Sequence, residues 1–404
     1  MLKHAAIPIA GCLLAALAFV CAPSASTPAD AAKAASSASV SASNAPSGAE
    51  TATPPRLTRV QFVDSGHGFA AGTAEEDATS RLWRTADGGR TWASFPIEEG
   101  MREATFSFAD EKNGWAIGPS ECNQAGGDVL CGRMTILRTE DGGRSWRGQW
   151  TVADPRAGGD AEIQAVDRDT AFVRVRSAIG KTTDGGKTWL DASIENAEEA
   201  APYHISFADA ATGYAVGRLG TECPDPGLVP SDRDADCRAA VWKTKDGGRS
   251  WTLQRRAPKL GGEWTPAAVQ FVDAGKGFAL FVNPETRGSL LYATDNGGVR
   301  WKLRSDKLPG IRPYPAKLAF VSPRVGYVPL RTGAGPVEGG LMKTTDGGST
   351  LVKLEDPRLV SVEDADFLDP QTGWIVAMNP DRPGSTLLLG TKDGGASWTD
   401  FTPR

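Results

Sequence analysis

Histidine, surplus positive charge and long apolar runs are scarce in this sequence of 404 residues, and each scarcity excludes a class of protein. Three histidines leave little material for a His-rich metal centre. The 44 Lys and Arg are outnumbered by 49 Asp and Glu, so the chain lacks the charge of a general nucleic-acid binder. The longest apolar run has about 16 residues, short for a membrane-spanning helix. No segment shows a convincing amphipathic helix, which favours an all-β protein.

The N-terminus has the features of an export signal. Lys3 gives a short basic start, an apolar stretch covers residues 5–20, and small residues at Ala22, Ser24 and Ser26 offer cleavage sites. This order of a charged start, an apolar core and small residues predicts a secretory signal peptide over residues 1–25. We therefore expect an exported protein of the periplasm or cell envelope.

Two other N-terminal arrangements stay open. Cys12 and Cys21 each follow apolar residues, so lipidation would anchor the chain to a membrane, as would an uncleaved signal. Residues 26–56 are mostly Ser, Ala, Thr and Pro, a composition that buries too little apolar surface to order itself. We expect this segment to be a flexible linker or tether.

Glycine and tryptophan are abundant, with 47 and 12 copies, because an eight-residue phrase recurs. Thr85–Trp92 reads Thr-Ala-Asp-Gly-Gly-Arg-Thr-Trp, and four later copies keep its Thr, Asp, Gly-Gly, hydroxyl and Trp. Two further copies have changed: Asn296 stands in the Asp position of one, and Leu351 replaces the Trp of the other. The seven residues in the Asp position are Asp87, Asp141, Asp184, Asp246, Asn296, Asp346 and Asp393.

A second phrase precedes each of these copies. It reads Phe62-Val63-Asp64, a short turn, and then Gly-Phe-Ala-Ala-Gly over residues 68–72. The third unit has the weakest match, with Ala171 where the others have glycine. Seven matched pairs of phrases at a period of about 50 residues indicate a radial repeat.

Each unit predicts four short strands, which in the first unit cover about 59–63, 68–71, 81–85 and 91–95. Seven such units predict a seven-bladed β-propeller of four-stranded antiparallel blades, folded as one domain over residues 57–404. The expected blades are about 57–96, 104–150, 162–194, 203–255, 266–304, 315–355 and 363–402.

The eight-residue phrase resembles the Asp-box, or BNR repeat. Its glycines permit positive φ in a tight turn, and its Asp and Ser or Thr can hydrogen-bond the turn. We therefore assign the carboxylates of the phrase a structural role rather than a catalytic one.

Two units carry an enlarged loop between their second and third strands. One insert runs from Cys122 to Cys131 and the other from Cys223 to Cys237, and both begin with a hydroxyl residue followed by Glu-Cys. In an exported protein we expect the disulfides Cys122–Cys131 and Cys223–Cys237, although four cysteines allow three pairings.

The second insert also contains alternating carboxylates at Asp232, Asp234 and Asp236, which resemble the start of a calcium loop. Cys237 stands where the turn glycine of such a loop belongs, and Lys243 stands where its bidentate Glu belongs. We therefore expect a solvated acidic loop and no cofactor.

The links between blades differ in charge. Those after the first and third blades are acidic, and those after the fourth and fifth are basic, which would orient a protein partner. Arg174, Arg176 and Arg218 follow second strands and are expected to extend the basic sector. The candidate partner-binding residues are Arg255, Arg256, Trp264, Arg304, Arg312 and Tyr314.

The seven units with their two phrases, behind an export signal, resemble the photosystem II stability/assembly factor family. Members of that family are seven-bladed propellers that bind an assembly intermediate through a basic patch on one face. The resemblance implies a non-enzymatic scaffold that binds a protein of an envelope or membrane complex. From the charge we expect no nucleic-acid partner, and the sequence leaves the oligomeric state open, with a monomer expected.

The alternative is a sialidase-like or other carbohydrate-active hydrolase, or a glycan-binding propeller. A sialidase needs a Tyr–Glu nucleophile pair, and only Tyr203 and Tyr314 lie outside repeat positions.

Overall fold

The computed structural model describes residues 55–74, 77–125, 128–153, 161–220, 223, 237–254, 258–261, 263–283, 285–286, 288–306, 308, 317–331 and 339–403. These residues form strands and turns, and none of them belongs to a helix that could span a bilayer. The predicted signal peptide, residues 1–25, and nearly all of the predicted linker lie outside the described residues.

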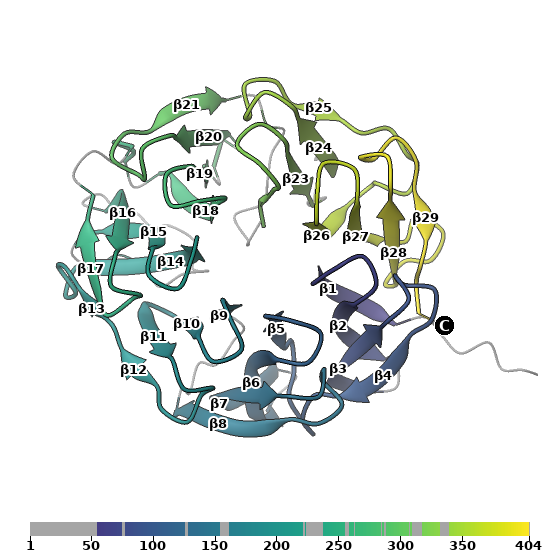
Figure 1. Cartoon of the computed structure of the whole chain (residues 1–404). Coiled ribbons are helices and arrows are strands. Elements are labelled where there is room, and N and C mark those ends of the chain that lie inside the picture. The colour runs from purple at the N-terminus through teal and green to yellow at the C-terminus, as the bar shows by residue number, and fades with distance from the viewer. Residues whose placement is uncertain are drawn as a thin grey trace, which may run out of the picture. The chain divides into compact units, whose positions relative to one another are not determined.

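Each blade begins at the centre of the ring and proceeds outward (Figure 1). The innermost strands are β1 (Arg56–Phe62), β5 (Thr105–Phe108), β9 (Ala161–Ala165), β14 (Ala200–Phe207), β18 (Thr265–Phe271), β22 (Ala319–Phe320) and β26 (Val362–Phe367). The second strands are β2 (Gly68–Ala74), β6 (Gly114–Ala125), β10 (Ala171–Val175), β15 (Gly213–Leu219), β19 (Gly277–Val282), β23 (Gly326–Leu330) and β27 (Gly373–Met378).

The two outer layers of strands flank the Asp-box turns. The third strands are β3 (Asp77–Thr85), β7 (Asp128–Thr139), β11 (Ala178–Thr182), β16 (Arg238–Thr244), β20 (Ser289–Thr294), β24 (Gly340–Thr344) and β28 (Thr386–Thr391). The outermost strands are β4 (Ala93–Pro96), β8 (Arg147–Ala153), β12 (Leu190–Asp191), β17 (Ser250–Leu253), β21 (Lys302–Ser305), β25 (Val352–Lys353) and β29 (Thr399–Asp400).

The seven sheets confirm the predicted all-β, seven-bladed propeller with antiparallel four-stranded blades. The fourth blade has one addition, because β13 (Ser193–Ile194) pairs in parallel with β17. This short strand belongs to the link from the third blade. It is held there because Leu253 N donates to Glu195 Oε2 and the Trp242 indole donates to Glu195 O.

Stacked aromatic rings join neighbouring blades, which explains the second phrase. Phe69 of blade 1 stacks on Phe108 of blade 2 with ring centroids 3.5 Å apart, and six of the seven junctions have such a pair. The glycine before the aromatic is required sterically, since a Cβ added at Gly68 would lie 2.4 Å from the ring of Phe62. The third unit has Ala165 in place of this phenylalanine, and the same position in its second strand accepts Ala171.

The first and last blades close the ring without exchanging strands. Leu57 N donates to Thr386 Oγ1 at 2.7 Å, and the Trp92 indole donates to Phe401 O at 2.9 Å. Phe62 stacks on Trp374 with ring centroids 3.5 Å apart. No strand crosses this seam, because every blade is a continuous piece of chain, and each of these contacts involves a side chain.

The Asp-box turn is locked to the turn between the first two strands of its own blade. In blade 1, Gly88 (φ 75°) and Gly89 (φ 94°) adopt the left-handed conformation that glycine allows, and Gly88 N donates to Gly66 O at 2.8 Å. Asp87 accepts hydrogen bonds from the Thr85 hydroxyl and from the N–H and hydroxyl of Thr91. The first glycine of every box makes the corresponding bond, so the two phrases face each other in all seven blades.

These hydrogen bonds predict acid unfolding. The hydroxyl and N–H of Thr91 lower the pKa of Asp87 to about 2, and the carboxyls of Asp184, Asp246 and Asp393 also have pKa values of about 2. A carboxyl whose pKa is lower in the folded protein stabilises it above its unfolded pKa, near 4, and that contribution is lost as pH falls towards 2. We expect the protein to unfold between about pH 4 and pH 2 with the uptake of several protons. Tryptophan fluorescence measured against pH would show the unfolding, and the steepness of the transition would give the number of protons.

Asp141→Asn supplies the matched variant, because Asn296 already occupies this position in blade 5 and its Oδ1 accepts from Arg300 N at 2.9 Å. It is expected to fold and to take up about one proton fewer on acid unfolding. Stability that stays constant from pH 4.5 to 2.5 would contradict this assignment.

Candidate functional site

Residues of all seven blades, most of them on inner strands, line a central cavity of about 350 Å³. Its wall alternates in character, because side chains of one strand face point into the channel and those of the other face pack between blades. The charged residues of the wall are Arg59, Glu162, Arg174, His204, Lys317, Asp364 and Asp366.

One layer of the wall consists of polar side chains that bridge each blade to the next. The Gln61 amide both donates to Phe108 O and accepts from Phe108 N at 2.9 Å. Gln164 and Gln270 bridge in the same reciprocal way to Phe207 and Phe320. At three other junctions an oxygen of Ser107, Ser206 or Asp366 accepts from a backbone N–H of the following blade.

One charged cluster joins blades 3 and 4. Glu162 accepts from Ile205 N at 2.9 Å and from the His204 imidazole, and it lies 3.7 Å from the guanidinium of Arg174. Burial alone would raise the pKa of Glu162, but the charges of His204 and Arg174 and the two hydrogen bonds outweigh it and lower the pKa to about 2. Glu162 is therefore ionised at neutral pH.

The other charged cluster joins blades 6, 7 and 1. The Lys317 ammonium lies 3.6 Å from Asp364 and 3.7 Å from Asp366, at the junction where Ala319 replaces the bridging amide. Asp364 and Asp366 also accept from the backbone N–H groups of Val60 and Phe62. Burial acts to lower the pKa of Lys317, but the two carboxylates raise it overall, while burial raises the pKa of Asp366.

The chemistry available in this channel is limited by these bonds. Glu162, Asp364 and Asp366 each hold a backbone N–H of the following blade and a cationic side chain, so each carboxylate is fixed in a structural contact. Within the described part of the chain, no group of three or more His, Cys, Asp or Glu side chains could hold a metal ion.

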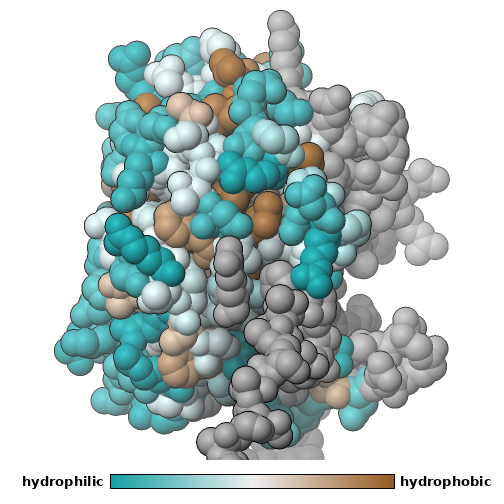
Figure 2. All heavy atoms as spheres, turned by 90° about the vertical axis from the view of Figure 1, so that its right-hand side faces the viewer, coloured by the Kyte–Doolittle hydropathy of each residue, from teal (hydrophilic) through white to brown (hydrophobic). Residues whose placement is uncertain are grey.

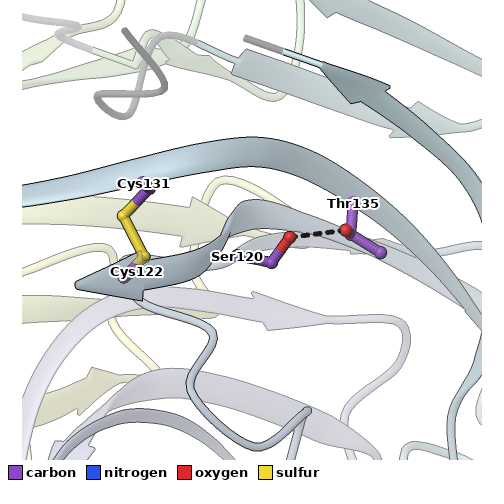
Figure 3. The surroundings of a disulfide bond; sticks show 4 residues. All are labelled: Ser120, Cys122, Cys131 and Thr135. Carbon is purple, nitrogen blue, oxygen red and sulfur yellow. Dashed lines mark hydrogen bonds between the residues drawn. A yellow bond between two sulfur atoms is a disulfide. The ribbon is translucent and has the colours of Figure 1, made fainter. Parts of the chain in front are cut away.

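A long hairpin carries the first disulfide. β6 and β7 pair as far as Ala125 and Asp128, beyond the part of β7 that also pairs with β8. Cys122 and Cys131 face each other across the hairpin and are bonded, and the Ser120 and Thr135 hydroxyls hydrogen-bond nearby at 2.6 Å (Figure 3). Cys131 is buried in a cluster with Ile163 and Val175, so the disulfide braces the hairpin against blade 3.

The second disulfide joins Cys223 and Cys237. Both disulfides expected from the sequence are thus confirmed. Asp232, Asp234 and Asp236 lie outside the described residues, and the absence of a cofactor stays a prediction.

Only two of the predicted partner-binding residues are described. Trp264 precedes the inner strand β18 and packs, half-buried, against a cluster that includes Phe281 and Tyr292. Arg304 is exposed on the outermost strand β21 rather than in the link. The two residues therefore occupy opposite edges of blade 5, and Arg255, Arg256, Arg312 and Tyr314 lie outside the described residues.

The structure also shows how exposed the three predicted basic-sector arginines and Tyr203 are. Arg174 and Arg218 do not extend an exposed basic sector, because both side chains are only 1% exposed, and the Arg218 guanidinium donates to Thr265 Oγ1 at 3.0 Å. Arg176, in the turn after β10, is partly exposed. Tyr203, expected to be available for chemistry, is buried in the inner strand β14.

The sequence interpretation missed the channel clusters. Their signal was present as polar residues two apart in first strands, such as Glu162 and Gln164 or Asp364 and Asp366. Alternation of this kind places both side chains on one face of a strand. The charged residues of these strands belong to no motif that the seven units share.

Comparison with known proteins supports the fold and a family likeness. The family model described as photosynthesis system II assembly factor YCF48 matches residues 40–201. A solved structure described as YCF48 bound to D1 peptide is 20% identical with a TM-score of 0.53, covering 84% of this chain and 92% of that one. No curated protein matches the sequence.

Carbohydrate-active proteins share the architecture. The GH74 xyloglucanase from Xanthomonas campestris is 13% identical with a TM-score of 0.58, over 87% of this chain and 55% of the enzyme. A PL25 ulvan lyase bound to a disaccharide unit is 10% identical with a TM-score of 0.53, over 87% and 97% of the chains. Identities this low show the fold alone. The chain is a seven-bladed β-propeller that resembles the YCF48-like photosystem II assembly factors, as its repeats predicted.

Proposed function

We propose that this protein is an exported, non-enzymatic propeller that binds a protein partner and serves the assembly of an envelope or membrane complex. The proposal rests on one observation: the carboxylates of the central channel and of the Asp-boxes, the two places where catalytic acids would be expected, are held in structural hydrogen bonds. Those of the channel hold backbone N–H groups of the following blade, and those of the Asp-boxes hold their own turns.

Family likeness supports the same conclusion. The matching family model describes an assembly factor, and the similar solved structure is described as holding a peptide of another protein. Two disulfides support export, because such bonds persist in oxidising compartments. The basic links after the fourth and fifth blades are the candidate contact surface for the partner.

The test is recovery of the partner from the exported fraction. We expect the C-terminally tagged chain to appear in the osmotic-shock or membrane fraction and, after brief cross-linking, to retain a specific partner. Arg255→Glu combined with Arg256→Glu is expected to reduce its recovery at least about tenfold, since charge reversal at a contact surface slows association and costs affinity.

The matched control reverses charge on the opposite face. Arg249 is exposed in the Asp-box turn of blade 4, so Arg249→Glu is expected to leave recovery unchanged. Equal recovery by all three proteins would remove the basic links from the proposal. Turnover of fluorogenic sialosides or plant glycans that disappears in Tyr203→Phe or Tyr314→Phe would overturn the non-enzymatic function.

A further inference from the structure

The seven blades share an internal position that holds a cation in five of them and a small residue in two. The residue immediately before the Asp-box threonine is basic in five blades and small in the other two. The five cations are Arg84, Arg138, Lys181, Lys243 and Lys343. The exceptions are Ala293 in blade 5 and Gly390 in blade 7.

Three of these cations contact the aromatic ring of their own second strand and donate to a carbonyl of the next blade. Lys243 Nζ lies 4.8 Å from the ring centroid of Tyr214 and donates to Gly297 O at 3.1 Å. Lys343 Nζ lies 5.6 Å from the ring centroid of Tyr327 and donates to Gly394 O at 2.7 Å. Gly297 and Gly394 are both the first glycine of an Asp-box.

A second carbonyl belongs to the same position. Tyr214 donates its hydroxyl to Ala274 O and Tyr327 donates to Pro370 O, each in the turn between the first two strands of the next blade. In blade 2 the guanidinium of Arg138 lies 4.0 Å from the ring centroid of Trp115 and donates to the corresponding Arg168 O at 2.7 Å. The position therefore provides an aromatic ring and two carbonyl oxygens for a cation with several N–H groups.

Between blades 7 and 1 the ring and the carbonyl-bearing turns are present without the cation. Trp374 is the aromatic residue and has no hydroxyl, while Ser65 and Gly88 are the counterparts of Ala274 and Gly297. These three residues and Gly390 line a cavity of about 460 Å³. Figure 2 views the ring from the side on which blades 7 and 1 lie, where small hydrophobic patches are set among hydrophilic residues.

Blade 5 also lacks the cation, because Ala293 stands in its position. A Cβ added at Gly348, in the following Asp-box, would lie 2.6 Å from Leu291 and 3.5 Å from Arg304 Cβ. At Gly390 the corresponding neighbour is the ring of Phe401, 2.8 Å from an added Cβ, and the cavity lies beside it.

The charged residues at the cavity resemble those that surround the lysines of blades 3 and 4. Arg90 and Lys392 line it together with Asp87. Lys181 occurs beside Arg249 with Asp246 opposing, and Lys243 occurs beside Lys245. Burial and the neighbouring cations act to lower the pKa of these two lysines, and Asp246 acts to raise that of Lys181, as Asp87 would for a cation in the cavity.

We propose that the cavity between blades 7 and 1 binds the guanidinium or ammonium group of an arginine or lysine side chain presented by a protein partner. The group contacts Trp374 and donates to the turns of Ser65 and Gly88, as the chain's own cations do in other blades. The site lies on the Asp-box face, opposite the links considered above, and does not depend on them.

The test uses a short peptide and its neutral isostere. The full chain is labelled with 5-fluorotryptophan, and the resonance of Trp374 is assigned by its loss in Trp374→Phe. We expect acetyl-Gly-Arg-Gly-amide to shift that resonance saturably, with a dissociation constant on the order of 1–10 mM for a single cation–π contact and two hydrogen bonds. The peptide with citrulline in place of arginine has nearly the same shape without the charge and should bind at least about tenfold more weakly.

A variant pair locates the binding. Thr399 is exposed and lies directly opposite Gly390 on β29, so Thr399→Arg supplies the cation from the chain itself and is expected to remove the response. Thr399→Ala should retain it. The proposal is overturned if the resonance does not shift, if the citrulline peptide shifts it equally, or if Thr399→Arg binds the peptide as the unaltered chain does.

Discussion

Trp374→Ala is expected to lower the free energy of unfolding by about 3–5 kcal/mol, the usual loss for truncating a buried tryptophan. Trp374 is 3% exposed and stacks on Phe62 at the seam between the last and first blades. No strand crosses this seam, and its hydrogen bonds, such as that from Leu57 N to Thr386 Oγ1, each involve a side chain. The cavity left by the substitution would weaken the main apolar contact there, and urea unfolding followed by circular dichroism measures the loss.

Trp115→Ala is the matched control, because Trp115 is fully buried at the junction of blades 2 and 3, where the chain itself links the blades. Both variants should lose comparable stability. Only Trp374→Ala should also speed hydrogen exchange selectively in β1 and β26, because the terminal blades can separate while the others remain packed. A loss below about 1 kcal/mol, or faster exchange throughout the ring, would show that other contacts hold the seam.

The fold could be predicted because its determinants are local and repeated. Asp87 bonds residues within four positions of itself, and Gly68 is required by Phe62 in the same blade. Such contacts need the same residues at the same spacing in each unit, so they appear as a period in the sequence. Even the irregular third unit follows this logic, since Ala165 and Ala171 changed together.

The channel could not be predicted in the same way because its partners are distant and differ between blades. Gln61 bridges to Phe108, 47 residues away, and Val60 donates to Asp364, 304 residues away. The bridging residue varies among Gln, Ser and Asp, so no motif marks it. Arg174 was expected to follow a second strand, whereas β10 includes it, and its partner Glu162 on β9 belongs to no shared motif.

Lys317→Met is expected to lower the free energy of unfolding by about 2–3 kcal/mol at pH 7. The substitution keeps most of the apolar stem but removes the ammonium that lies 3.6 Å from the carboxylate of Asp364 and 3.7 Å from that of Asp366. Asp364 is only 1% exposed, whereas the Lys317 side chain is 41% exposed to the channel, so the loss should be smaller than for a fully buried pair. Chemical unfolding at several pH values measures it.

The dependence on pH separates charge from packing. Without Lys317, at least one of the two carboxyls should bind a proton more readily in the folded than in the unfolded chain. The difference in the free energy of unfolding between Lys317→Met and the unaltered protein should therefore become smaller as pH falls from 7 to 5. Adding Asp366→Asn should recover much of the loss at pH 7, because it removes the repulsion and keeps an oxygen that can accept from Phe62 N. Lys317 would stabilise the junction by packing rather than by its charge if two results held together. The difference in the free energy of unfolding would be equal at pH 7 and pH 5, and the double variant would be no more stable than Lys317→Met.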